Sequence, residues 1–155
     1  MPELAEFAGR WAVARRIEDR RAGQVVHFTG WAAFRPDAAG LIYDEEGTLD
    51  VPGQAPMAAT RRYLWQSAPG GIDVFFADGR FFHAIAPGHT PCARHDCPPD
   101  TYDVSYDFTA WPTWRAVWNV IGPRKDYRMI TDYSPLGACT GRCAGAEGSE
   151  RLQRE

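Results

Sequence analysis

Nine short segments of this chain have the composition of β-strands and are separated by turn signals, which restricts the folds open to it. Alternate residues of a strand point to opposite faces, and Arg10 to Arg20 shows this alternation, with Trp11, Val13, Arg15 and Ile17 on one face. The other candidates are Gln24 to Phe34, Gly40 to Glu46, Ala58 to Ser67, Ile72 to Ala77, Arg80 to Ala86, Tyr102 to Phe108, Thr113 to Ile121 and Lys125 to Tyr133. Asp78-Gly79, between two apolar runs, is the strongest hairpin signal. These strands and short turns predict an antiparallel meander without long helices.

A sheet of this length usually closes on itself, because closure removes exposed edge strands. We therefore predict an all-β fold, a single antiparallel up-and-down β-barrel of eight to ten strands over residues 1–135. Two segments interrupt the pattern. A long loop containing Pro and Cys is expected near residues 87–100, and residues 136–155, rich in Gly and Ala and then charged, are expected to form a weakly ordered, flexible tail.

Composition excludes several classes of partner. The 155 residues are 45% hydrophobic and 24% charged, as in one globular domain, and the net charge of −3 provides no basic surface for nucleic acid. No run approaches the ~20 apolar residues of a membrane-spanning helix, and the start lacks a secretory signal pattern. We therefore expect a cytoplasmic monomer or homodimer whose partner is a small molecule, with neither nucleic acid nor a membrane as partner.

Three polar residues are in phase with apolar residues of their strands and are predicted to face the barrel interior. They are Arg15 (with Val13 and Ile17), His83 (with Phe81 and Ile85) and Tyr106 (with Val104 and Phe108). Aromatic pairs that share a face would form flat walls: Tyr63 with Trp65, and Trp114 with Trp118. One cation, one imidazole and several phenol or indole donors suit a planar ligand that carries a carboxylate or a carbonyl.

Other interpretations of the same residues stay open at this stage. Arg15 would also be explained by packing on the Trp11 indole at the barrel floor, and His83 by a satisfied core histidine. An enzyme, an isomerase or cyclase, would use His83 as general acid or base, with Tyr106 or Tyr43 polarising a substrate oxygen. A protein-interaction module would use the segment from Pro87 to Pro99.

Metal and thiol chemistry provide a further alternative. His89, Cys92, His95 and Cys97 offer two imidazoles and two thiolates for zinc, although their spacing matches no common zinc module. A haem held by His83 or a loop histidine is the other metal hypothesis. Cys139 and Cys143 form a second close pair, and without a secretory signal free thiols are expected.

Motifs for nucleophilic or phosphate chemistry are missing. The sequence has no Gly-x-Ser-x-Gly, no Gly-x-Gly-x-x-Gly and no Walker-type lysine. Glu45 and Glu46 are adjacent, so a strand would place them on opposite faces, which argues against a shared acid–base site.

Several motifs carry a resemblance to known families. Gly9-x-Trp11 and Thr131-Asp132-Tyr133 resemble two lipocalin signatures, and in lipocalins the first strand closes against the last. The ordered set that includes Tyr43-x-Glu45-x-Gly47, Arg62-Tyr63-x-Trp65, His95-x-Cys97 and Gly122-Pro123-Arg124-Lys125-Asp126-Tyr127 resembles domain of unknown function 6314 over about residues 5 to 133. That resemblance implies a lipocalin-like, or calycin, barrel and no particular activity.

The predicted function is the binding of a small, partly apolar, anionic or carbonyl-bearing ligand inside the barrel. The residues expected to bind it are Arg15, Tyr43, Arg62, Trp65, His83, Tyr106, Trp118, Arg124, Lys125 and Tyr127. No metal or other cofactor is expected in this primary interpretation.

Overall fold

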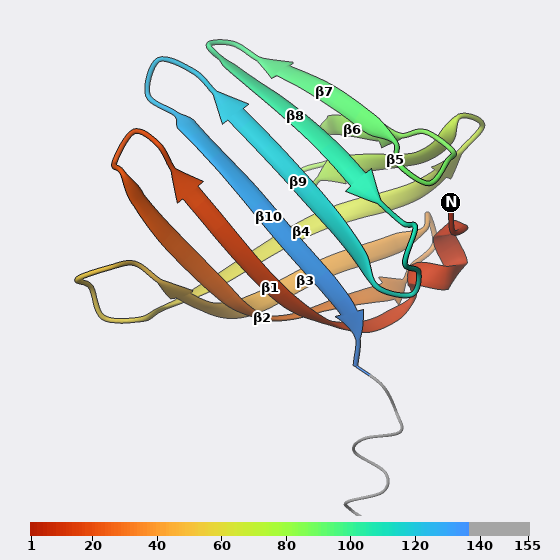
Figure 1. Ribbon diagram of the computed structural model, residues 1–155. Coiled ribbons are helices and arrows are strands. Elements are labelled where there is room, and N and C mark those ends of the chain that lie inside the picture. The colour runs from red at the N-terminus through yellow and green to blue at the C-terminus, as the bar shows by residue number, and fades with distance from the viewer. Residues whose placement is uncertain (137–155) are drawn as a thin grey trace, which may run out of the picture.

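A computed structural model of the protein describes residues 1–136, and its ten antiparallel strands curl into a nearly closed barrel (Figure 1). A short 3-10 turn, η1 (Leu4–Phe7), precedes the strands. The strands are β1 (Gly9–Asp19), β2 (Gln24–Pro36), β3 (Leu41–Asp50), β4 (Met57–Ala68), β5 (Gly71–Phe76), β6 (Phe81–Ile85), β7 (Cys92–Cys97), β8 (Asp100–Asp107), β9 (Trp114–Ile121) and β10 (Asp126–Pro135). The predicted all-β barrel of eight to ten strands is confirmed.

The sheet is continuous from β6 through β1 to β7, because the first strand pairs with the last. Arg15 pairs with Thr131, and Val13 with Tyr133, in the β1–β10 ladder. The strand order is β6-β5-β4-β3-β2-β1-β10-β9-β8-β7, so β6 and β7 are the edge strands and face one another across a seam. The predicted pairing of the first and last strands is confirmed. The barrel is incompletely closed at the seam between β6 and β7.

The segment expected as a long loop, residues 87–100, contains a tenth strand. β7 pairs with β8, and Ala93 lies opposite Val104. Sequence alternation missed β7 because its inward residues are small or polar. Its inward positions are Ala93, His95 and Cys97, so no large aliphatic residue marks the buried face.

Strand β3 continues to Asp50, four residues beyond the predicted end at Glu46. Gly47 does not end the strand; it pairs with Gly30 of β2. A Cβ at Gly47 would lie 2.7 Å from Cζ of Phe28 and would overlap the carbonyl oxygen of Thr29. The two glycines therefore serve a close approach of two strands, which explains glycine inside a strand.

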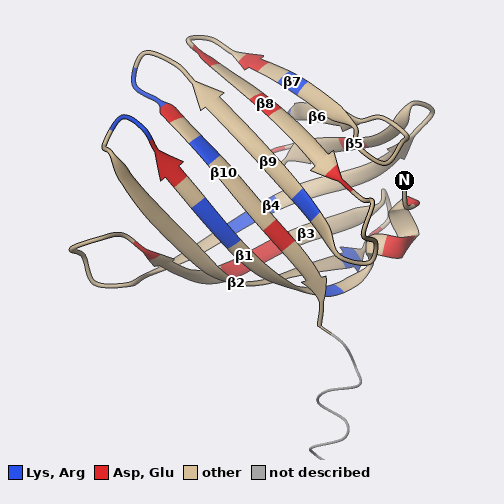
Figure 2. Cartoon of the chain, in the orientation of Figure 1, with Lys and Arg blue, Asp and Glu red and all other residues tan. Residues whose placement is uncertain are grey.

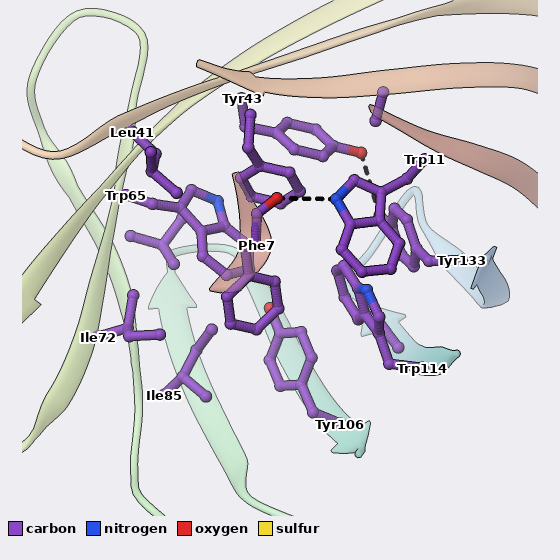
Figure 3. Close-up of a cluster of buried hydrophobic side chains, with 14 of the residues drawn as sticks. Phe7, Trp11, Leu41, Tyr43, Trp65, Ile72, Ile85, Tyr106, Trp114 and Tyr133 are labelled. Carbon is purple, nitrogen blue, oxygen red and sulfur yellow. Dashed lines mark hydrogen bonds between the residues drawn. The ribbon is translucent and has the colours of Figure 1, made fainter. Parts of the chain in front are cut away.

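Aromatic side chains fill the end of the barrel that carries the N-terminus (Figure 3). Phe7 is fully buried, and its carbonyl oxygen accepts a hydrogen bond of 2.8 Å from Nε1 of Trp11. The Phe7 ring contacts five others, those of Phe34, Trp65, Phe108, Trp111 and Trp114. Turn η1 thus closes this end of the barrel.

The outer face carries charged residues of both signs, interspersed along the strands (Figure 2). Many form cross-strand ion pairs, such as Arg115 with Asp132 at 2.7 Å and Arg94 with Asp103 at 2.8 Å. These side chains are more than 40% exposed, so each pair contributes at most about 1 kcal/mol.

Some expectations fall beyond the described residues or concern only part of them. The predicted tail from residue 137 onward, with Cys139 and Cys143, lies outside the part of the chain that the structure describes. Between residues 1 and 136, no helix has the length and apolar character needed to cross a membrane.

Candidate functional site

A cavity of about 280 Å³ lies inside the barrel, between the aromatic plug of η1 and the opposite, open end. Five hairpin turns surround the open end, since alternate turns of a meander lie at the same end: β1–β2, β3–β4, β5–β6, β7–β8 and β9–β10. The lining combines aromatic, cationic and hydroxyl groups from Arg15, Tyr43, Glu45, Arg61, Tyr63, Trp65, Val74, Phe76, Phe82, His83, His95, Cys97, Tyr102, Tyr106, Trp114, Ala116, Trp118, Lys125, Tyr127, Met129 and Tyr133.

An ion pair occupies one wall of the cavity. Nη1 and Nη2 of Arg15 donate to the two carboxylate oxygens of Glu45 at 2.8 and 2.7 Å, and Nε of Arg15 donates to Oγ1 of Thr131 at 2.8 Å. The guanidinium carbon also lies 5.1 Å from the centroid of the Phe28 ring. The Arg15 side chain of β1 is therefore held by residues of β3 and β10, and its charge is neutralised by Glu45.

Both members of this pair stay ionised. Burial works to raise the pKa of Glu45, but the hydrogen bonds and charge of Arg15, with the Tyr43 hydroxyl, outweigh burial and lower that pKa. For Arg15, burial works to lower the pKa, and the hydrogen bonds and charge of Glu45 help to raise it above its ordinary value. The wall is thus polar but carries no net charge from this pair.

Two tyrosines extend the polar wall toward the closed end. The Tyr43 hydroxyl donates to Glu45. The Tyr43 and Tyr133 hydroxyl oxygens are 3.0 Å apart, and Figure 3 shows these two side chains. Tyr133 also stacks on Trp114, with centroids 3.7 Å apart. Burial raises the pKa of Tyr133 to about 12, so this hydroxyl remains protonated at neutral pH.

On the opposite wall, His83 of β6 meets Tyr106 of β8 across the seam. Nε2 of His83 and the Tyr106 hydroxyl are 2.8 Å apart, and both side chains are buried. Burial, with a smaller effect of the His95 charge, lowers the pKa of His83 to about 3. The imidazole is therefore neutral at physiological pH.

The hydrogen-bond inventory favours one tautomer of His83. Nδ1 of His83 is buried without a partner among the described residues. If the Tyr106 hydroxyl donates to Nε2, only the Nδ1 hydrogen is unmatched; the reverse arrangement would leave both Nδ1 and the phenol hydrogen unmatched. Because each unmatched buried polar atom costs about 1–3 kcal/mol, we assign Tyr106 as the donor.

Cationic groups gather near the open end. Nζ of Lys125 donates to the Tyr102 hydroxyl at 2.9 Å and lies 3.0 Å from the Asp100 carboxylate. These hydrogen bonds, to Tyr102 and then Asp100, raise the pKa of Lys125. Arg61 donates to the Tyr63 hydroxyl at 3.0 Å, and no carboxylate in residues 1–136 lies within ion-pair distance of it. Arg61 is therefore the cation of the lining whose charge is least offset.

The structure places eight of the ten predicted ligand-binding residues around one cavity. These are Arg15, Tyr43, Trp65, His83, Tyr106, Trp118, Lys125 and Tyr127. Arg62 and Arg124 do not line it. Arg62 points to the outer face, where it pairs with Asp44 at 2.6 Å, and Arg124 is exposed in the β9–β10 turn.

Several lining residues were missed, and alternation signalled two of them. Arg61 is in phase with Tyr63 and Trp65, whereas Arg62 is not, so strict alternation would have chosen Arg61. Glu45 is likewise in phase with Tyr43. Phe82 was beyond such reasoning, because a register shift in the β5–β6 ladder places it and His83 inward together, while Phe81 is 52% exposed.

The four residues considered for zinc are not assembled on one face. His95 and Cys97 line the cavity, whereas Cys92 is on the outer face of β7 and His89 is exposed. Cys92 and Cys97 are exposed free thiols. Over residues 1–136, no three His, Cys, Asp or Glu side chains come together as a metal site.

Comparisons with known proteins agree with this architecture. A model of a family of unknown function (DUF6314) matches residues 7–135. The structure is similar to that of the S-type phycobiliprotein lyase CPES from Guillardia theta, with a TM-score of 0.64 and 9% identity over 87% of this chain and 91% of that one. At this identity the likeness shows the barrel fold alone. No curated protein matches the chain.

Proposed function

The chain belongs to this family of unknown function (DUF6314), and we propose from the lining of its cavity that it binds a small, planar, mostly apolar organic anion, such as an aromatic carboxylate. The observation that carries the proposal is the arrangement of charge in a cavity with aromatic walls. Arg15 is neutralised by Glu45 and Lys125 is offset by Asp100, while Arg61 retains its charge at the open end.

This arrangement gives the ligand an orientation. Its carboxylate would lie near Arg61 and Lys125, and its flat apolar body would lie deeper, against Trp118, Trp65 and Tyr106. Aromatic rings gain free energy from such contacts beyond simple burial. At about 280 Å³ the cavity lies just below the roughly 300–1,000 Å³ typical of ligand sites, which favours a ligand of one or two fused rings.

The similarity to a phycobiliprotein lyase supports the use of this fold around a small molecule and does not identify the ligand. The ligand class follows from the residues that line the barrel. A carbonyl group on the ligand would also be compatible with the donors of the inner wall, Tyr43, Tyr106 and Tyr133.

The pKa values support binding over acid–base catalysis by His83 and Tyr106. A general base works best when its pKa is near the operating pH, and the pKa of His83 is about 3. Burial raises the pKa of Tyr106 well above its ordinary value, so this phenol is a weak acid. The pair is better suited to fixed hydrogen bonds than to proton transfer.

The test is a calorimetric titration with 2-naphthoate, with 2-naphthamide as an uncharged probe of the same shape. The carboxylate should bind more tightly than the amide. Arg61→Gln should weaken 2-naphthoate binding by about 10-fold, the typical loss for a charge-assisted hydrogen bond, and should leave the amide unaffected.

Arg62→Gln is the matched control, because Arg62 is the next residue on the same strand and points outward to Asp44. It should leave the affinity for 2-naphthoate unchanged. Absence of saturable binding by the carboxylate, or equal losses in the two variants, would refute the proposed site.

A further inference from the structure

An irregularity in the β5–β6 ladder turns Phe82 into the barrel. Val74 pairs with His83, but the next pair is Phe75 with Phe81, so Phe82 is an extra residue on β6. Such β-bulges re-aim side chains. As a result Phe82 is 6% exposed and its neighbour Phe81 is 52% exposed.

The Phe82 ring lies in a stack contributed by distant strands. It is nearly parallel to Phe76 of β5, with centroids 4.4 Å apart and a 20° angle between planes. It is also nearly parallel to Trp118 of β9, at 5.1 Å and 15°. Because β5 and β9 approach from different sides of the seam, Phe82 occupies a slot about one aromatic ring thick.

This slot adjoins the cationic end of the cavity. The Phe82 centroid is 6.2 Å from that of Tyr102, whose hydroxyl accepts the Lys125 hydrogen bond. Phe82 also packs edge-on against His95 of β7 at 5.2 Å. A flat ring in place of Phe82 would therefore lie between two aromatic faces and close to a cation.

We propose that Phe82 is the specificity-determining residue that limits the size of the ligand, because its ring fills the slot between Phe76 and Trp118 that an additional ligand ring would otherwise enter. This inference rests on the proposed binding of planar anions and adds which of them the barrel admits. The wild-type cavity accepts one or two fused rings, and removal of the Phe82 ring extends the cavity toward larger polycyclic carboxylates.

The experiment compares two probes, 2-naphthoate and the larger, fluorescent pyrene-1-carboxylate, on the full chain. Phe82→Ala should bind pyrene-1-carboxylate at least about 10-fold more tightly than wild type, because the larger ligand can bury an additional aromatic ring in the space that the Phe82 ring leaves. Phe81→Ala is the matched control, because Phe81 is the preceding residue on the exposed side of β6. It should bind both probes as wild type does.

Phe82→Leu keeps an apolar side chain and replaces Phe82→Ala in the titration if the alanine variant is unfolded at the temperature of the measurement. The leucine variant should show a smaller gain in affinity for the pyrene probe. Melting temperature and near-ultraviolet circular dichroism show whether each variant is folded. If wild type binds 2-naphthoate but neither folded Phe82 variant gains affinity for the pyrene probe, the inference about Phe82 is overturned and the proposed function stands. If neither wild type nor variants bind either probe, the proposed function fails as well.

Discussion

The guanidinium of Arg15 and the carboxylate of Glu45 form a two-pronged ion pair inside the barrel wall, with hydrogen bonds of 2.8 and 2.7 Å. Their side chains are 15% and 4% exposed, so neither charge is well hydrated. In such a setting each charge depends on the other, because removal of one partner leaves the second buried and uncompensated.

Replacing only one member of this pair should therefore be costly. Arg15→Met should lower the free energy of unfolding by about 3 kcal/mol, since Glu45 would remain buried without its counterion. The double variant Arg15→Met with Glu45→Leu should recover most of that loss. Urea denaturation of wild type, both single variants and the double variant measures the coupling, and a double variant as unstable as the sum of the singles would contradict this account of the wall.

The buried imidazole of His83 predicts a pH dependence of stability. Its folded-state pKa of about 3 lies below the ordinary 6.5, so between these values the unfolded chain binds the extra proton. The neutral form of His83 therefore leaves the free energy of unfolding at its full value above pH 6.5, and this free energy decreases as the pH falls toward 3. At pH 5 the loss from His83 alone should be about 2 kcal/mol.

The control for that measurement is His83→Gln, which cannot titrate. Protonation of carboxylates with a lowered pKa, such as Glu45, also lowers the free energy of unfolding in acid. This effect is the same in both proteins and therefore cancels in the comparison. The free energy of unfolding, measured from pH 7.5 to 4.5, should fall more steeply for wild type than for the variant. Parallel curves would show that His83 is accessible to protons in the folded state.

The glycine pair of β2 and β3 predicts a sharp steric effect. Gly47→Ala would place a methyl group against Thr29 and Phe28, and so should destabilise the protein by about 2 kcal/mol or more. Gly70→Ala is the matched control, because its Cβ meets nothing within 4 Å and should change the melting temperature little. Equal melting temperatures for the two variants would contradict the close approach of β2 and β3.

The two free thiols of β7 provide a footprint of the bound ligand. Both Cys92 and Cys97 are exposed, but only Cys97 lines the cavity. Saturating 2-naphthoate should therefore slow alkylation of Cys97 by iodoacetamide and leave that of Cys92 unchanged. Peptide mapping by mass spectrometry separates these sites from Cys139 and Cys143, and equal protection of both β7 thiols would argue against binding in the cavity.

Alternation along the strands predicted most of the fold and much of the site, because in a barrel it decides which side chains face inward. Arg15 and Tyr106 were identified in this way, and both line the cavity. His83 was placed inward by its phase with Ile85, but its assumed partner Phe81 points outward. The bulge at Phe82 breaks the alternation, and no local sequence signal marks it.

Cross-strand relationships were beyond prediction from the sequence. Glu45 pairs with Arg15 only because β1 and β3 flank β2 and curve around a common interior. Strand β7 was missed because its inward residues are small or polar, and the seam beside it follows from tertiary closure. The register that places Gly47 opposite Gly30 also depends on pairing between strands, so the sequence did not show that the strand predicted to end at Glu46 continues through Gly47.

The central claim is that the barrel interior is a binding site for planar organic anions. Titration of the ¹⁵N-labelled protein with 2-naphthoate, followed by two-dimensional amide and indole NMR spectra, tests it most directly. We predict that the chemical shifts of Arg61, Phe82, Trp118 and Lys125 change most and that these changes saturate with increasing 2-naphthoate. Shifts that never saturate, or that are confined to the outer faces of the strands, would contradict the claim.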